Sequence, residues 1–249
     1  MQSLRRSSRI WVAVAIIGLV LVPTLPTFAE NTATMPVPRD AGWVKRHEGF
    51  VEIAKKGGVD VLFLGDSITD AWGGEGHNKN AAGNKIWEST FVPLKAANFG
   101  IGGDRTQHVL WRITNGELEG ITPKVAMLMI GTNNSNRDDN TAAEIAEGVT
   151  AIVKTIREKT PHTKILLLAI FPRGEKPNPQ REKIKAVNDT IAKLDDGKMV
   201  RYLDIGPKFL AEDGTLTKEI MPDFLHLTEK GYQIWADAVT PTLKEMLGK

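Results

Sequence analysis

The stretch VDVLFLGDS, residues 59–67, decides the fold of this chain. Residues 59–64 form an almost unbroken apolar run, which is typical of a short strand covered on both faces. The run ends in Gly65-Asp66-Ser67, small and polar residues that suit a turn. Similar runs recur downstream, and we expect a strand at each of them: 96–99 (the weakest), 124–130, 164–171 and 199–205.

The segments between these runs carry apolar residues at helical spacing. The stripes are Val109, Leu110 and Ile113; Ile145, Val149, Ile152, Val153 and Ile156; Ile184, Val187, Ile191 and Leu194; and Ile234, Trp235, Ala238 and Leu243. Thr141, with Glu144 three residues later, has the pattern of a capping box at the start of the second stripe. Alternating strands and helices predict an α/β fold with a parallel sheet flanked by helices. We expect one domain at 43–249, preceded by a polar lead-in at 30–42.

The first 29 residues have the composition of a secretory leader. Arg5, Arg6 and Arg9 precede an apolar run of 13 residues at 10–22, and Thr27-Phe28-Ala29 places small residues where a signal peptidase reads. Such a run is shorter than the roughly 20 residues that span a bilayer. We therefore expect residues 1–29 to be a signal peptide cleaved after Ala29, leaving a secreted or periplasmic chain without a stable membrane anchor.

Composition excludes several classes of site. The chain has no cysteine, which rules out disulfides, thiolate metal sites and a cysteine nucleophile. Its formal net charge is +2, but without the three leader arginines 29 basic residues face 30 acidic ones, so we expect no nucleic-acid partner. The histidines lack metal-ligand spacing, and GIGG at 100–103 does not complete a dinucleotide-binding pattern. We expect neither a metal nor an organic cofactor.

Polar residues follow the predicted strands at the edge where open parallel sheets bind ligands, the carboxyl ends of the strands. The four blocks are Gly65-Asp66-Ser67, GIGGD at 100–104, GTNN at 131–134 and DFLH at 223–226, the last just before the final helical stripe. Because they follow different strands of one sheet, we expect them to lie close together.

These blocks contain the groups that acyl transfer requires. Ser67 can attack a carbonyl carbon once a base such as His226 removes its proton. Asp223, three residues upstream, can orient the imidazole and stabilise its protonated form. The backbone N–H groups of Ser67 and Gly103 and the side-chain amide of Asn133 can stabilise the oxyanion of the tetrahedral intermediate.

The sequence also resembles a known family. The blocks GDSI (65–68), NFGIGGDRT (98–106), GTNN (131–134) and DFLH (223–226) resemble the four blocks of the SGNH, or GDSL-type, serine esterases. The longer stretches at 98–112, 115–119, 172–179 and 223–228 are similar to the catalytic subunits of intracellular platelet-activating-factor acetylhydrolase. The resemblance extends over residues 43–247.

The resemblance implies a flavodoxin-like three-layer α/β/α sandwich with five parallel strands, which hydrolyses short, often acetyl, esters without a cofactor. It implies that Ser67 is the nucleophile, that Asp223 and His226 complete the triad, and that Gly103 and Asn133 donate to the oxyanion. It further implies that the residue at position 225, a leucine, closes a small acyl pocket. Because the resembling subunits dimerise, a homodimer is also an expectation.

Two features depart from those subunits. The subunits are cytosolic, whereas this chain begins with a leader. The loop at 71–85 (AWGGEGHNKNAAGNK) is longer than theirs and rich in Gly and Asn. We expect the loop to form part of the substrate mouth, with Trp72 in contact with the substrate. Both departures favour an O-acetylated glycan at least as much as a phospholipid.

The sequence therefore predicts an exported serine esterase that acts on a small ester or an O-acetylated glycan. A short-chain lipase or lysophospholipase is the alternative enzyme, and a preference for long acyl chains would indicate it. A catalytically silent glycan-binding module on the same fold is the alternative without catalysis. Such a module would be expected to lack Ser67, Asn133 or His226, and all three are present.

Overall fold

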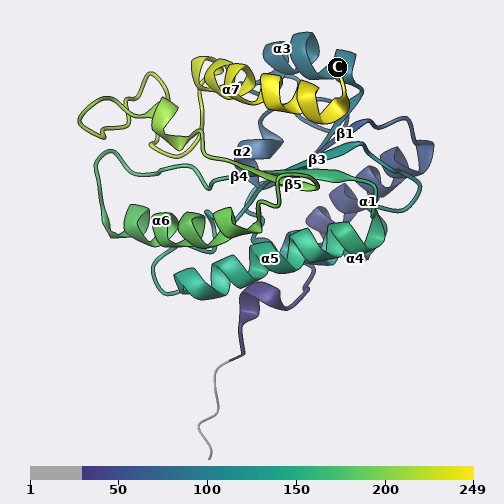
Figure 1. Ribbon diagram of the computed structural model, residues 1–249, viewed down its shortest axis with the longest axis horizontal. Helices are drawn as coiled ribbons and strands as arrows, with labels where there is room; N and C mark the ends of the chain where they lie inside the picture. The colour runs from purple at the N-terminus through teal and green to yellow at the C-terminus, as the bar shows by residue number, and fades with distance from the viewer. Residues whose placement is uncertain (1–29) are drawn as a thin grey trace, which may run out of the picture. The chain divides into compact units, whose positions relative to one another are not determined.

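The computed structural model describes residues 30–249, and these residues form a five-stranded sheet with helices on both faces (Figure 1). The strands are β1 (Val61–Gly65), β2 (Ala96–Gly100), β3 (Val125–Met129), β4 (Lys164–Leu168) and β5 (Val200–Leu203). They lie in the order β2-β1-β3-β4-β5, and every neighbouring pair is parallel. The predicted α/β/α sandwich with five parallel strands is confirmed. The predicted leader lies outside the described residues.

The helices divide into two layers (Figure 1). One face of the sheet is covered by α1 (Ala41–Lys56), α4 (Thr106–Thr114), α5 (Ala142–Lys159) and α6 (Pro179–Ile191). The other face is covered by the short α2 (Ser67–Asp70) and α3 (Asn84–Ile86) and by the long α7 (Glu229–Leu247). Helix α1 was not anticipated from the sequence. The capping box at the start of α5 is confirmed, since the Thr141 N–H donates to Glu144 Oε2 at 2.7 Å.

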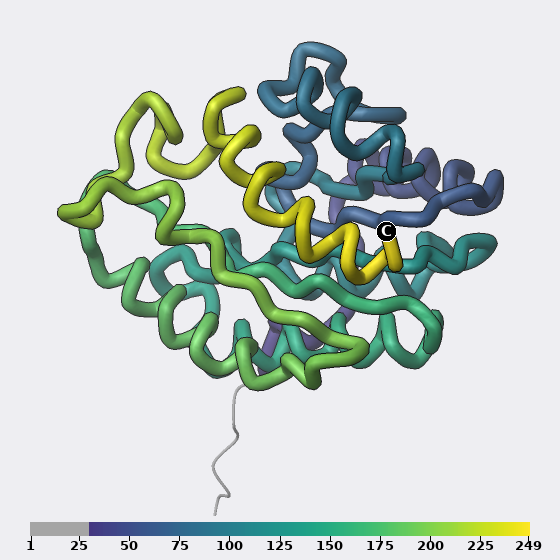
Figure 2. The backbone as a smooth tube through the Cα atoms, turned by 45° about the horizontal axis from the view of Figure 1, so that its top comes forward, coloured from purple at the N-terminus to yellow at the C-terminus, as the bar shows by residue number. Residues whose placement is uncertain are grey.

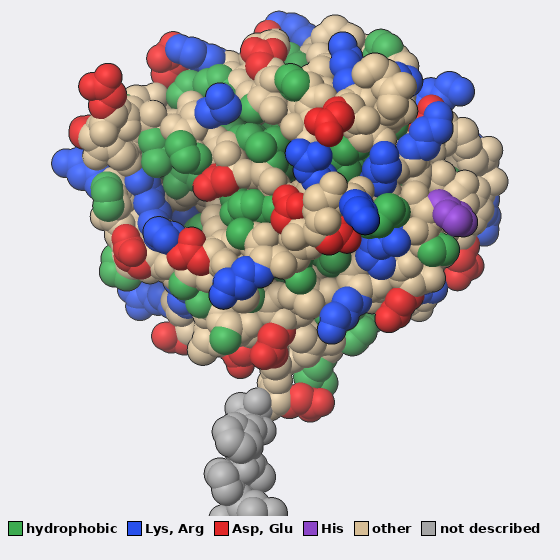
Figure 3. Space-filling model, viewed as in Figure 1, with side chains coloured by type: hydrophobic (Ala, Val, Ile, Leu, Met, Phe, Trp, Pro, Cys, Tyr) green, Lys and Arg blue, Asp and Glu red, His purple; other side chains and the backbone are tan. Residues whose placement is uncertain are grey.

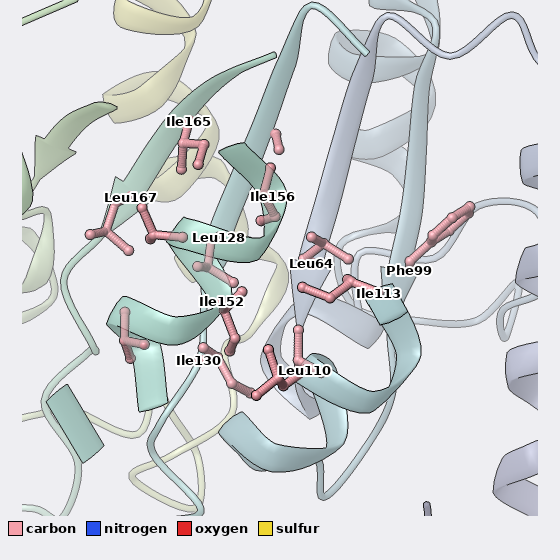
Figure 4. Close-up of a cluster of buried hydrophobic side chains, with 14 of the residues drawn as sticks. Leu64, Phe99, Leu110, Ile113, Leu128, Ile130, Ile152, Ile156, Ile165 and Leu167 are labelled. Carbon is pink, nitrogen blue, oxygen red and sulfur yellow. The ribbon is translucent and has the colours of Figure 1, made fainter. Parts of the chain in front are cut away.

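Alternate residues of the strands supply the two halves of the core. Leu62 and Leu64 point to the α1/α4/α5/α6 layer, whereas Val61 and Phe63 point to the α2/α3/α7 layer. Figure 4 shows Leu64 and its neighbours on β3 and β4 packed against isoleucines of α4 and α5. Both faces of the sheet are therefore buried, as the apolar runs in the sequence required.

The lead-in is part of the packed fold. The compact unit begins at Asn31, and Ala33 is completely buried. The Ala33 carbonyl oxygen accepts a hydrogen bond from Thr106 Oγ1 on α4 at 2.8 Å. Asp40 caps α1 by accepting from the backbone N–H groups of Gly42 and Trp43. The segment before residue 43 thus docks on α4 and α5 and starts the first helix.

Helix α3 lies beside the start of α7, where Figure 2 shows the blue and yellow segments side by side. An ion pair between Lys85 Nζ and Glu229 Oε2, 2.9 Å apart, joins the two segments. The face seen in Figure 3 has basic and acidic side chains interspersed. Among residues 30–249, no helix has the length and apolar character needed to cross a bilayer.

Candidate active site

Ser67 is the first residue of α2, directly after β1, so its side chain stands at the carboxyl edge of the sheet. The Asp66 carboxylate caps this helix by accepting from the Ile68 N–H at 3.0 Å. Gly65 makes the tight turn between strand and helix possible, because a Cβ there would lie 2.1 Å from Thr69 Oγ1 and 2.5 Å from the Met129 carbonyl oxygen. The sequence thus places a serine hydroxyl on a short, fixed helix.

His226 and Asp223 lie in the loop before α7 and reach Ser67 from the other end of the chain. Ser67 Oγ is 2.9 Å from His226 Nε2, and His226 Nδ1 is 2.6 Å from Asp223 Oδ2. Nδ1–H facing a carboxylate leaves Nε2 free to accept the serine proton. Ser67 is therefore connected, across more than 150 residues of sequence, to His226 and Asp223 in the arrangement expected of a nucleophile, a base and an orienting acid.

The DFLH turn holds the histidine from its own backbone. Asp223 Oδ1 accepts hydrogen bonds from the backbone N–H groups of Leu225 (3.1 Å) and His226 (2.7 Å). Phe224 adopts the left-handed backbone region with φ of 60°, an uncommon conformation for a bulky residue and one that often marks functional turns. Burial raises the pKa of the Asp223 carboxyl, but the hydrogen bonds from His226 and Leu225 outweigh it and lower that pKa below its usual value. Asp223 is therefore ionised wherever the imidazole is needed as a base.

The expected oxyanion donors come from three neighbouring segments. Gly103, in the loop after β2, has a φ of 78°, a conformation that favours glycine. The Asn133 side chain is half-buried and its Nδ2 donates one hydrogen to the Asp104 carbonyl oxygen at 2.8 Å, which leaves the second hydrogen available. Within residues 30–249, the backbone N–H groups of Ser67 and Gly103 donate to no protein acceptor. Three N–H groups are thus available for a developing negative charge.

A buried ion network lies behind these donors. Arg112 is completely buried and its guanidinium contacts Asp104 Oδ2 at 2.9 Å and Glu117 Oε2 at 2.6 Å. Asp104 Oδ1 also accepts from Trp43 Nε1 at 2.7 Å. Burial raises the pKa of the Asp104 carboxyl despite the neighbouring Arg112. The network ties Asp104, and with it the loop that carries Gly103, to α1 and α4.

The structure overturns the expectation that Trp72 contacts the substrate. Trp72 is completely buried and packs against Phe63, Tyr232 and Trp235, so it does not contact a substrate at the surface. The chain turns into the core directly after α2, and the indole follows it. Leu225, in contrast, is only partly buried, and it packs against the half of the core that lies between the sheet and α2, α3 and α7. In sequence it lies between Asp223 and the histidine that Asp223 orients, His226.

The loop at 71–85 is attached to the body of the protein through His77. The His77 side chain is buried, with Nδ1 2.7 Å from Asp70 Oδ1 and Nε2 2.8 Å from the Asn98 carbonyl oxygen. Asp70, Arg46 and Arg39 were not singled out from the sequence, because their contacts are made over long separations. In the described part of the chain, no cluster of three His, Asp or Glu side chains could hold a metal ion.

Comparisons with known proteins agree with this geometry. The model of the GDSL-like lipase/acylhydrolase family matches residues 63–234. The human platelet-activating factor acetylhydrolase IB subunit alpha1 is 39% identical over 226 residues, which are 88% of this chain and 93% of the relative. The rat alpha2 subunit is 44% identical over 209 residues, 82% of this chain and 86% of the relative.

Solved structures share the fold. A GDSL-like lipase from Bacteroides thetaiotaomicron has a TM-score of 0.61 at 18% identity and covers 78% of this chain and 90% of its own. An acetyl-xylooligosaccharide esterase from Geobacillus has a TM-score of 0.59 at 18% identity, covering 78% and 95%. The family model spans more than half of the chain and contains Ser67, Gly103, Asn133, Asp223 and His226. This chain belongs to the GDSL-like lipase/acylhydrolase family and is a carboxylic ester hydrolase.

Proposed function

We propose that this chain is an exported serine esterase that hydrolyses short acyl esters, above all acetyl esters. The observation that carries the proposal is the continuous hydrogen-bonded connection from Ser67 Oγ through the His226 imidazole to Asp223. His226 takes the serine proton as Oγ attacks the ester carbonyl, then gives it to the departing alcohol. A water molecule, from which His226 takes a proton in the same way, then attacks the acyl-serine. The acid is released, and the proton returns from His226 to Ser67.

The second requirement is to stabilise the negative charge that develops on the carbonyl oxygen in each tetrahedral intermediate. The free N–H groups of Ser67 and Gly103 and the Asn133 amide supply donors from three segments that the fold holds in place. Preorganised donors of this kind stabilise the transition state without reorganising during the reaction. A catalytically silent module would have no use for this arrangement beside a paired serine and histidine.

The preference for a short acyl group is supported by the surroundings of His226. Phe224 and Leu225, the two apolar residues before His226, pack against the half of the core under α2, α3 and α7. We infer that Leu225 bounds the acyl side of the site. The relatives at about 40% identity carry the name acetylhydrolase. Each methylene that fits an apolar pocket contributes about 0.8 kcal/mol, so an open cleft would instead favour longer chains.

The alcohol part of the substrate faces an open side of the site. The side chains of His226 and Asp223 are 41% and 54% exposed, so a bulky leaving group meets little obstruction from the base. This exposure supports an O-acetylated glycan as one substrate class.

Export is supported by the extent of the folded unit, since a mature chain that begins at Glu30 contains all of the unit that starts at Asn31. Intact-mass measurement from the native host tests export, and an uncut chain in the membrane fraction would contradict it.

The experiment is a comparison of kcat/KM for p-nitrophenyl acetate, butyrate and octanoate, together with acetate release from acetylated xylooligosaccharides. We expect acetate to be preferred over butyrate and strongly over octanoate, and we expect Ser67→Ala to abolish turnover while leaving the fold intact. A kcat/KM that rises from acetate to octanoate would replace this proposal with the short-chain lipase or lysophospholipase alternative.

A further inference from the structure

Asp70 closes the nucleophile helix α2, and its carboxylate is turned toward the loop after β2. Asp70 Oδ2 accepts the Gly102 backbone N–H at 2.9 Å. Gly102 is also close to the nucleophile, because a Cβ built on it would lie 3.8 Å from Ser67 Cβ. The residue before the oxyanion donor Gly103 is therefore bound directly to the helix that carries the serine.

Asp70 is itself fixed by two further side chains. Arg46 of α1 donates to both of its oxygens, from Nη1 to Oδ2 at 2.7 Å and from Nη2 to Oδ1 at 2.5 Å. His77 Nδ1 lies 2.7 Å from the same Oδ1 and 2.8 Å from Arg46 Nη2. Burial alone would raise the pKa of the Asp70 carboxyl, but the hydrogen bonds from His77 and Arg46 lower it to about 2. The carboxylate is therefore ionised near neutral pH, and Arg46 and His77 hold it in place.

Arg39 holds Gly102 from its other backbone group, the carbonyl oxygen. Its Nη1 donates to the Gly102 carbonyl oxygen at 2.8 Å and to Asp104 Oδ1 at 3.1 Å. The Gly102 carbonyl and the Gly103 N–H belong to one peptide unit, and in a trans peptide these groups point in opposite directions. A guanidinium that fixes the carbonyl therefore also fixes the direction of the N–H.

The loop itself contributes one turn hydrogen bond, from the Asp104 N–H to the Ile101 carbonyl oxygen at 3.1 Å. Its two central residues are glycines, which have the widest choice of backbone conformations, so the loop is easily distorted without further contacts. Oxyanion stabilisation depends on a donor that is already aimed before the charge develops. Taken with the proposed esterase function, on which the inference rests, we propose that Asp70 and Arg39 are positioning residues. They clamp Gly102 at its N–H and at its carbonyl oxygen and so aim the next N–H, that of Gly103, at the oxyanion. Arg46 and His77 keep Asp70 in place.

The variants Asp70→Ala and Arg39→Ala test the clamp, with matched controls on other ion pairs. Asp60, paired with Lys124 at the opposite end of β1, is 25% exposed against 21% for Asp70. Arg201, paired with Glu245, is 35% exposed against 30% for Arg39. Asp60→Ala and Arg201→Ala each remove an ion-paired side chain of similar exposure without touching the loop. Asp70→Asn keeps an oxygen that can accept the Gly102 N–H.

Turnover of p-nitrophenyl acetate is normalised to the amount of Ser67 that a fluorophosphonate labels when the reaction has gone to completion, which corrects for misfolded protein but not for a slower labelling rate. We expect kcat to fall about tenfold or more in Asp70→Ala and Arg39→Ala with KM within about threefold, because the donor acts chiefly in the transition state. We expect Asp70→Asn to recover part of the loss and both controls to retain wild-type kcat. Wild-type kcat in Asp70→Ala and Arg39→Ala would overturn the inference.

Hydrogen–deuterium exchange provides a readout that does not depend on activity. Exchange in the peptide covering residues 98–106 should become faster in Asp70→Ala and Arg39→Ala and stay unchanged in the two controls. If the wild-type protein hydrolyses no ester but this difference is seen, the clamp stands and the proposed function fails. Unchanged exchange in both variants would overturn the clamp whatever the activity.

Discussion

Replacing Asn133 and Asn134 separately by alanine distinguishes a catalytic amide from a structural one at adjacent positions. Asn133 is half-buried and makes a single side-chain hydrogen bond, to the Asp104 carbonyl oxygen. Asn134 is completely buried and accepts from the Thr106 N–H at 2.9 Å while its Nδ2 donates to Gln107, Asn140 and Thr106. The two substitutions are chemically identical, so only their positions differ.

The structure gives different magnitudes for the two variants. Loss of one oxyanion donor should lower kcat by roughly 10²–10³-fold in Asn133→Ala with little change in KM or melting temperature. Asn134→Ala removes several buried hydrogen bonds worth about 1 kcal/mol each, so we expect destabilisation by about 3 kcal/mol. In a domain of this size that corresponds to a fall in Tm of roughly 6–12 °C.

The assay measures kcat and KM for p-nitrophenyl acetate at a temperature well below both melting transitions, with Tm taken from thermal unfolding of the same samples. We expect the kcat loss and the Tm loss to separate cleanly between the two variants. If Asn134→Ala, corrected for its folded fraction, loses more kcat than Asn133→Ala, the oxyanion donor has been assigned to the wrong asparagine.

Three other predictions concern burial, packing and specificity. Burial raises the pKa of the Asp66 carboxyl from its ordinary value to about 7, so its ionisation destabilises the fold as pH rises from about 4 to 7. The free energy of unfolding of Asp66→Asn, measured by urea denaturation, should therefore exceed that of wild type by about 4 kcal/mol at pH 8 and by less at pH 5, and an equal difference at both pH values would refute this. Gly148→Ala should lower Tm although it improves helix propensity, because its Cβ would lie 2.7 Å from the Ala33 carbonyl oxygen; a higher Tm would show that the lead-in does not pack there. Leu225→Ala should raise kcat/KM for p-nitrophenyl butyrate relative to acetate by about tenfold, the value of two accommodated methylenes, and an unchanged ratio would remove Leu225 from the acyl pocket.

The sheet could be predicted from sequence because its signal is local. Each strand is a short apolar run covered on both faces. The predicted runs 124–130 and 164–171 contain β3 and β4, and β1 lies in the run 59–64 except for its last residue, Gly65. Helix α1 was missed although Asp40 supplies an N-cap and Trp43, Phe50 and Ala54 form a buried stripe. The core face of that helix also contains His47, which is buried by pairing with Glu117 at 3.0 Å. A polar residue at a core position hides the apolar period on which such predictions depend.

The site could be predicted as far as strand ends determine it. Ser67 and Gly103 follow β1 and β2, so parallel topology brings them to the same edge whatever their separation in sequence. Asp70 and Arg39 could not be found in this way, because their roles depend on hydrogen bonds to a loop more than 30 residues away. Trp72 was misassigned because proximity to the nucleophile in sequence gives no information on which way the chain turns after α2.

Labelling of the purified protein with a fluorophosphonate, followed by peptide mass spectrometry, tests the central claim most directly. The reagent modifies a serine only where a base and oxyanion donors activate it. We predict a single adduct on Ser67, a rate of labelling that falls strongly in His226→Gln, and no adduct in Ser67→Ala. An adduct on another residue, or labelling at the same rate in His226→Gln, would contradict the assignment of Ser67 as a nucleophile activated by His226.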